Sequence, residues 1–119
     1  LRGITTTNAA VELFLNGSTE RYTIPAGLVS SMLINITGAK SDGSAVAHYV
    51  RQYSIKNVAG TTSQVYAPVT VGTDNAAGTS IAVSANDTND ALKIEATGVL
   101  NETWRWIAVI ECAEIAYAL

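Results

Sequence analysis

The sequence predicts an all-β protein, an antiparallel β-sandwich of jelly-roll-like type with about eight strands. Turn-forming residues recur at short intervals along the 119 residues, and the stretches between them alternate apolar and polar side chains. Hydrophobic residues make up 48% of the chain but aromatic residues only 7%. The core must therefore be built mainly from Ala, Val and Ile, which suits the flat space between two packed sheets.

The beginning of the chain is polar and rich in Thr, so we expect residues 1–10 to form an N-terminal arm or linker. Residues 11–119 are then a single β-sandwich domain, because the length suits one hydrophobic core. Residues 11–15 and 21–24 read as strands on either side of Asn16-Gly17, a pair that favours a tight turn. The sequence therefore predicts a hairpin here.

Strict alternation with a period of two marks the rest of the chain as strands rather than helices. Pro68 cannot donate a backbone hydrogen bond, so its strand is expected at a sheet edge or at a bulge. The predicted strands cover residues 28–40, 45–58, 63–71, 79–85, 91–97 and 103–117. The apolar faces of these strands predict a core that includes Ile34, Ile36, Val83, Ile94, Trp106, Ala108 and Ile110.

The composition argues against catalysis and against several classes of partner. The net charge is −3 and the seven basic residues are scattered, so we expect no nucleic-acid partner. No apolar run approaches the roughly 18 residues of a membrane-spanning helix. His48 and Cys112 are the only residues of their kinds. We expect a half-buried structural His48, a buried and inert Cys112, no metal, no cofactor and no enzymatic activity.

The most distinctive cluster is Trp104, Arg105 and Trp106, in which both indoles share one face of a strand. In a domain poor in aromatic residues, the tryptophans are predicted to anchor the core. The alternative is an interface or a ligand platform, together with Tyr49 and Tyr53, because aromatic residues beside Arg are enriched in binding surfaces.

Three segments together resemble a β-sandwich module of structural proteins of tailed bacteriophages, cyanophages included. They read TTTNAAVELFLNGSTERYTIPAG, SDGSAVAHYVRQYSIKN and ANDTNDALKIEATGVLNETWRWIAVIECAEI. The resemblance extends from about Thr5 to Glu114, and the part from Leu92 to Trp106 is its most specific portion.

This resemblance implies a protein at the virion surface, either a head-decoration protein or part of a tail fibre or spike, with no catalytic residues. Charged residues make up only 14% of the chain, so we also expect a homo-oligomer, most simply a trimer. The expected partners are copies of the chain, other virion structural proteins and a host surface glycan. The alternative function is a carbohydrate-binding module whose exposed aromatic rings stack on sugar.

Overall fold

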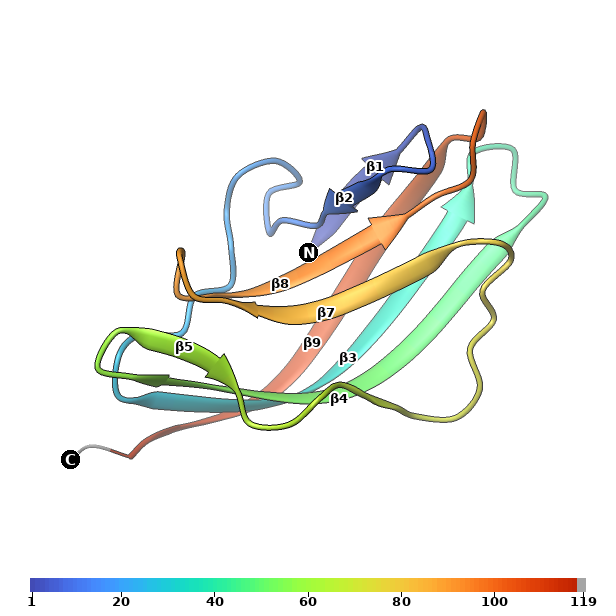
Figure 1. Ribbon diagram of the computed structural model, residues 1–119. Coiled ribbons are helices and arrows are strands. Elements are labelled where there is room, and N and C mark those ends of the chain that lie inside the picture. The colour runs from blue at the N-terminus through green and yellow to red at the C-terminus, as the bar shows by residue number, and fades with distance from the viewer. Residues whose placement is uncertain (118–119) are drawn as a thin grey trace.

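Nine β-strands form two antiparallel sheets in the computed structural model, which describes residues 1–117 (Figure 1). The large sheet has the order β1-β9-β3-β4-β5, with β6 also paired to β4, and the small sheet has the order β2-β8-β7. The expected all-β antiparallel sandwich is confirmed. The strands are β1 Arg2–Thr5, β2 Ala10–Glu12, β3 Leu28–Lys40, β4 Val46–Val58, β5 Thr61–Gln64, β6 Val69–Thr70, β7 Ser80–Asn86, β8 Ala91–Thr97 and β9 Trp104–Ala116.

The three longest strands, β3, β4 and β9, lie side by side in the large sheet, as Figure 1 shows. Each has 13 residues, and β3 pairs with β9 on one side and with β4 on the other. Along β3, Met32, Ile34 and Ile36 are buried, whereas the intervening Leu33 and Asn35 are exposed. This period of two gives the large sheet an inner face toward the small sheet and an outer face toward solvent.

The core lies between the two sheets, and six of the seven residues predicted for it are buried. These are Ile34, Ile36, Val83, Ile94, Trp106 and Ala108. Ile110 is only partly buried, although it packs against the same cluster. Cys112 and Glu114 follow it on the same face of β9 and are exposed. The apolar cover over β9 therefore ends near Ile110.

The large sheet is interrupted at the edge beside β4, as Pro68 predicted. β5 and β6 both pair with β4, and Pro68 lies between them in a stretch without strand structure. Proline has no N–H to give to a ladder, so the edge is two short pieces instead of one strand.

Residues 1–10 contain a strand, which corrects the expectation of an arm or linker. β1 pairs with β9, and the amino group of Leu1 donates to the carbonyl of Ala108 at 2.8 Å. On its other side, Arg2 exchanges two backbone hydrogen bonds with Phe14, close to β2. β1 thus joins the large sheet to the small one and closes this side of the sandwich.

The Asn16-Gly17 turn forms, but the predicted hairpin does not. Gly17 has a φ of +86°, and the Asn16 side chain accepts hydrogen bonds from the three backbone amides that follow Gly17. The two flanks pair with β8 instead of with each other: the amide of Leu13 donates to Ile94, and the amide of Leu92 donates to Tyr22. Residues 21–24 accordingly make only an isolated bridge and are not a strand of the sheet.

Candidate functional site

The aromatic residues proposed as a ligand platform lie inside the protein. The exposed fractions of Trp104, Trp106, Tyr49 and Tyr53 range from 0% to 3%. The two indole rings stack on each other, with centroids 5.8 Å apart and planes inclined by 21°. This corrects the interpretation of these four side chains as a sugar-stacking surface and confirms the tryptophans as core anchors. The even-numbered positions of β9 face the small sheet, and that is why both indoles are enclosed.

The polar atoms of these buried rings have partners within the protein. The Trp106 indole N–H donates to Thr5 Oγ1 at 3.1 Å, and the Trp104 indole N–H donates to Glu102 Oε2 at 2.9 Å. The bond from Trp104, followed by the nearby ammonium of Lys40, lowers the pKa of Glu102 below its ordinary value. These bonds leave neither indole N–H available for a ligand.

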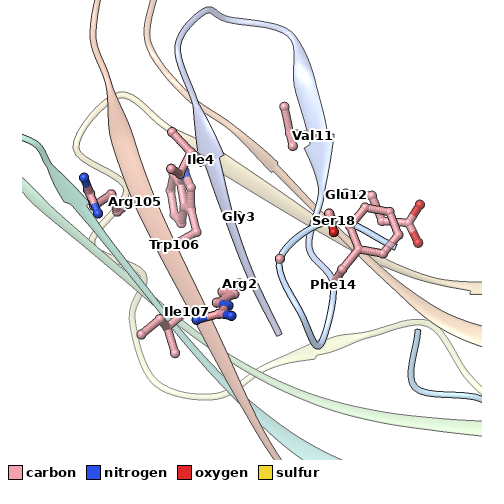
Figure 2. Close-up of a pocket in the computed structure, with 11 residues that line it drawn as sticks. Arg2, Gly3, Ile4, Val11, Glu12, Phe14, Ser18, Arg105, Trp106 and Ile107 are labelled. Carbon is pink, nitrogen blue, oxygen red and sulfur yellow. The ribbon is translucent and has the colours of Figure 1, made fainter. Parts of the chain in front are cut away.

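Arg105 is the one member of the predicted platform that is exposed, and it lines a groove at the closed side of the sandwich (Figure 2). The groove has a volume of about 690 Å³ and lies between β1, β2, β9 and the Asn16-Gly17 turn. We call it the edge groove. Its wall includes Arg2, Ile4, Phe14, Arg105, Trp106 and Ile107.

The edge groove combines an apolar surface with two arginines. Ile4 and Ile107 are more than half exposed, and Phe14 is covered on one side by the Arg21 guanidinium, whose Cζ lies 5.0 Å from the ring centroid. Within residues 1–117, no carboxylate lies at ion-pair distance from Arg2 or Arg105. Glu12, whose carboxylate pairs with Arg21, lines the groove as well, so the groove presents charges of both signs beside its apolar surface.

Sequence reasoning found Arg105 and Trp106 but missed the contribution of Arg2 and Ile4. Both belong to the stretch that was expected to be an arm, and β1 has only four residues. The groove exists because β1 places Ile4 opposite Arg105 and Arg2 opposite Ile107. No local pattern in so short a strand could have predicted a partner about 100 positions away in the chain.

The outer face of the large sheet carries a row of exposed apolar side chains, which we call the outer stripe. Its members are Ile4, Leu33, Ile107, Val109 and Ile115. The exposed fractions of Val109 and Ile115 are 56% and 65%. The outer stripe runs along β9 and its neighbours β1 and β3, so it adjoins the edge groove at Ile107. The exposed Glu111 separates Val109 from Ile115 on this face of β9 and lies opposite Leu33. Exposed apolar neighbours such as Ile107 and Val109 are typical of a protein interface.

Cys112 is exposed, which corrects the expectation of a buried thiol. Its sulfur accepts a hydrogen bond at 3.4 Å from the hydroxyl of Tyr22, which also bonds the carboxylate of Glu114 and the hydroxyl of Ser30. Partial burial, and after it the hydrogen bonds to Cys112 and Glu114, raises the pKa of Tyr22 above its ordinary value. The thiol is exposed because the small sheet does not cover this part of β9.

His48 is also exposed rather than half-buried. Its Nε2 lies 2.9 Å from Oδ1 of Asn35, and its backbone forms a bridge with Asn75. Over residues 1–117, no three His, Cys, Asp or Glu side chains are grouped in a way that would hold a metal ion. The same residues contain no helix long and apolar enough to cross a membrane.

Comparisons with protein-family models, with curated proteins and with solved structures found no match to this chain. The class that the structure defines is therefore the all-β antiparallel sandwich, with an arginine-flanked apolar groove at its closed side. Any function has to be argued from that geometry and from the sequence.

Proposed function

We propose that this chain is a self-associating structural domain at the surface of a tailed-bacteriophage virion, either a capsid decoration or a part of a tail fibre or spike. The sequence resemblance to phage β-sandwich modules supports the virion setting. The outer stripe supports self-association, and it is the observation that carries the proposal.

The outer stripe matters because its apolar side chains are exposed. Ile107 and Val109 are neighbours on the outer face of β9, and Ile4 lies diagonal to Ile107 on β1. Leu33 lies opposite the exposed Glu111. An apolar sheet face left in water favours association, because covering it removes apolar area from solvent. At a virion surface, copies of the chain or other virion proteins would cover the outer stripe.

The proposed role needs no catalysis. The titratable groups with shifted pKa values are held in structural contacts, such as Arg51 with Asp74 and Lys40 with Glu102. Neither pair lines the edge groove. We propose a function without a cofactor, without nucleic acid and without a membrane. It depends only on the surfaces that bind other copies of the chain and other virion proteins.

Two measurements test this proposal. Quantitative mass spectrometry of purified phage particles is expected to find the chain at a fixed copy number relative to the major capsid protein. Its absence from particles would contradict the virion role. Light scattering on the isolated chain is expected to give a mass above that of the 12.5 kDa monomer, and we expect a Val109→Lys substitution in the outer stripe to lower it. The surface of the opposite edge offers a control, Val65→Lys, which should leave the mass unchanged.

A further inference from the structure

Asn16-Gly17 is the only Asn-Gly pair in the chain, and this pair is the sequence in which asparagine deamidates most readily. The reaction requires the backbone nitrogen that follows asparagine to reach the side-chain carbon Cγ. Glycine has no Cβ to hinder that approach. The turn is exposed to water, which is the other reactant. The chain therefore carries a site of spontaneous chemical modification beside the start of β1.

The reaction proceeds through a cyclic imide. The Gly17 amide gives its proton to hydroxide, and its nitrogen attacks Cγ of Asn16, so that a new N–C bond forms. The bond from Cγ to Nδ2 breaks, and the side-chain nitrogen leaves as ammonia. Water then opens the imide at either carbonyl, which leaves aspartate or isoaspartate at position 16. No enzyme, oxidant or cofactor takes part.

In the folded chain the attacking nitrogen is directed elsewhere. The Gly17 amide donates to the carbonyl of Phe14 at 3.2 Å. Once the proton is lost, the electron pair of the nitrogen occupies the same direction, toward Phe14 and away from the Asn16 side chain. The Phe14 carbonyl also accepts from the amide of Arg2 at 2.7 Å, and the Phe14 amide donates to the Arg2 carbonyl at 3.1 Å. The position of the Phe14 carbonyl thus depends on β1.

Arg2 also holds the other end of the reacting peptide group. Its guanidinium donates to the carbonyl of Asn16 at 3.4 Å, and that carbonyl belongs to the peptide group whose nitrogen is the nucleophile. A Cβ atom at position 17 would lie 3.3 Å from Nε of Arg2. The peptide between Asn16 and Gly17 is therefore held at its carbonyl by Arg2 and at its amide by Phe14.

The carboxamide of Asn16 is held at both of its polar atoms. Its Oδ1 accepts from the amides of Ser18, Thr19 and Glu20 at 2.9 to 3.0 Å. Its Nδ2 donates to Thr19 Oγ1 at 2.9 Å. The carboxamide has to rotate before its face meets the Gly17 nitrogen, and rotation breaks these four bonds. Each such bond changes an equilibrium constant by a factor of about two to about ten.

We propose that Asn16 is a deamidation site that the folded turn keeps closed, and that it opens when β1 separates from Phe14. While β1 is in place, neither the peptide group nor the carboxamide reaches the geometry of attack. When β1 leaves, the Phe14 carbonyl is free to turn, and the Gly17 amide turns with it. Deamidation at position 16 then records how often this side of the sandwich opens.

Modification would change the edge groove, because Gly17 and Ser18 are part of its wall. Figure 2 shows Ser18 and Phe14 across the groove from Ile107. An aspartate at position 16 adds a negative charge to the turn that contacts Arg2. An isoaspartate adds a methylene group to the main chain and displaces the amides that follow it. Either product alters the surface that the groove offers.

Peptide mapping of the full chain provides the test. Trypsin cuts after Arg2 and Arg21, so residues 3–21 form one peptide, which also contains the exposed Asn8 as an internal reference. The chain is incubated in mildly alkaline buffer, either folded or unfolded in urea, and mass spectrometry follows deamidation at each asparagine. We expect Asn16 to react about thirtyfold or more slowly in the folded chain, which is the effect of four weak hydrogen bonds. Asn8, which precedes Ala9, should differ far less between the two states.

A proline variant tests the dependence on β1. Arg2→Pro removes the amide that donates to Phe14. Arg2→Ala is the matched control, because it loses the same guanidinium and keeps the amide; in both variants the tryptic peptide begins at residue 1. In the folded state we expect Asn16 to deamidate about fivefold faster or more in Arg2→Pro than in Arg2→Ala. In urea the two variants should react at the same rate.

Equal rates at Asn16 in the folded and the unfolded chain would overturn the protection, and no reaction at Asn16 in urea would overturn the site itself. Equal folded-state rates in Arg2→Pro and Arg2→Ala would overturn the role of β1. If circular dichroism shows that Arg2→Pro is unfolded, Thr5→Val loosens β1 instead, because it removes the acceptor of the Trp106 indole. Thr6→Val, at an exposed position, is its control. Deamidation that is no faster in Thr5→Val than in Thr6→Val would also overturn the role of β1.

Discussion

Gly38 leaves the space that the indole ring of Trp106 fills. The two residues are direct partners in the β3–β9 ladder, and Trp106 is buried beneath the small sheet. A Cβ atom at position 38 would lie 2.6 Å from Cε3 and 2.7 Å from Cη2 of that ring. The glycine is required here by close packing across the ladder rather than by an unusual backbone angle.

Gly38→Ala is therefore expected to destabilise the protein by about 1–3 kcal/mol, because the added methyl group forces the indole out of position. Urea unfolding measures the loss, and Thr37→Ala, on the exposed face of the same strand, is the control. In a Trp106→Phe background the smaller ring should relieve most of the penalty. An undiminished penalty in that background would show that the ring is not what the methyl group meets.

The Trp106 ring itself should be among the most costly side chains to remove. Only 1% of it is exposed, so Trp106→Ala leaves a large cavity and is expected to cost about 3–5 kcal/mol. Chemical denaturation tests this value. A loss below about 1 kcal/mol would mean that the core relaxes around the site far more than large-to-small substitutions usually allow.

The hydrogen bond between Trp106 and Thr5 makes a second, separable contribution. Thr5→Val keeps the shape of the side chain but leaves the buried indole N–H without its acceptor, which is expected to cost about 1–3 kcal/mol. The partners are 101 positions apart in the chain, so the bond also fastens β1 to the core. In Trp106→Phe, which has no N–H, Thr5→Val should cost almost nothing; a cost that persists would assign the effect to packing.

Asn57 is a polar residue that the core depends on. It is fully buried, its Nδ2 donates to the carbonyl of Ile24 at 2.8 Å, and its Oδ1 accepts from the amide of Gly60 at 2.9 Å. Asn57→Ala leaves the carbonyl of the buried Ile24 without its donor, whereas the amide of the exposed Gly60 can bond to water, and we expect a loss of about 1–3 kcal/mol. Asn35→Ala, at an exposed position, should change the unfolding free energy little. Equal effects of the two substitutions would refute this prediction.

Acid should weaken the ion pair between Arg51 and Asp74. The guanidinium donates to both carboxylate oxygens, at 2.7 and 2.8 Å, and these hydrogen bonds lower the pKa of Asp74 below its ordinary value of 3.8. A lowered pKa in the folded state means that the stabilisation is complete above pH 3.8 and is lost as the pH falls through the lower value.

Because the Asp74 side chain is 30% exposed, solvent screening limits the contribution to about 1 kcal/mol or less. Asp74→Asn should remove this part of the pH dependence, while Glu20→Gln, at an exposed carboxylate, serves as the control. Unfolding measured between about pH 6 and about pH 2 decides it. If the free energy of unfolding falls by the same amount at low pH in the variant and in the parent protein, the pair has no role in acid unfolding.

The long strands could be predicted from the sequence because their pattern is local. Met32, Ile34 and Ile36 alternate with outward-facing residues whatever strand lies beside them, and Pro68 marks an interrupted edge by its own chemistry. Cys112 was placed wrongly for a different reason. The apolar run around it is consistent with burial, but whether the small sheet extends that far depends on the lengths of other strands.

The candidate site was predictable only in part. Arg105 attracted attention because it lies between two tryptophans, yet the edge groove needs Arg2 and Ile4, which β1 brings to it from the other end of the chain. The indoles shared a face, as their spacing requires, but spacing alone does not say whether that face is toward the core or toward solvent. The pairing of strands that are far apart in the sequence determines which face of β9 is turned toward the core.

The central position of β9 also determines when the protein can fold. β9 pairs with both β1 and β3 and carries both tryptophans, yet the ribosome makes it after the other eight strands among residues 1–117. Until it emerges, β1 has only its bridge to Phe14, the β9-facing edge of β3 has no partner strand, and the incomplete core is exposed. Sheets built from such distant pairings fold on the slower scale of milliseconds to seconds. The nascent chain is thus most vulnerable to aggregation just before its synthesis reaches β9.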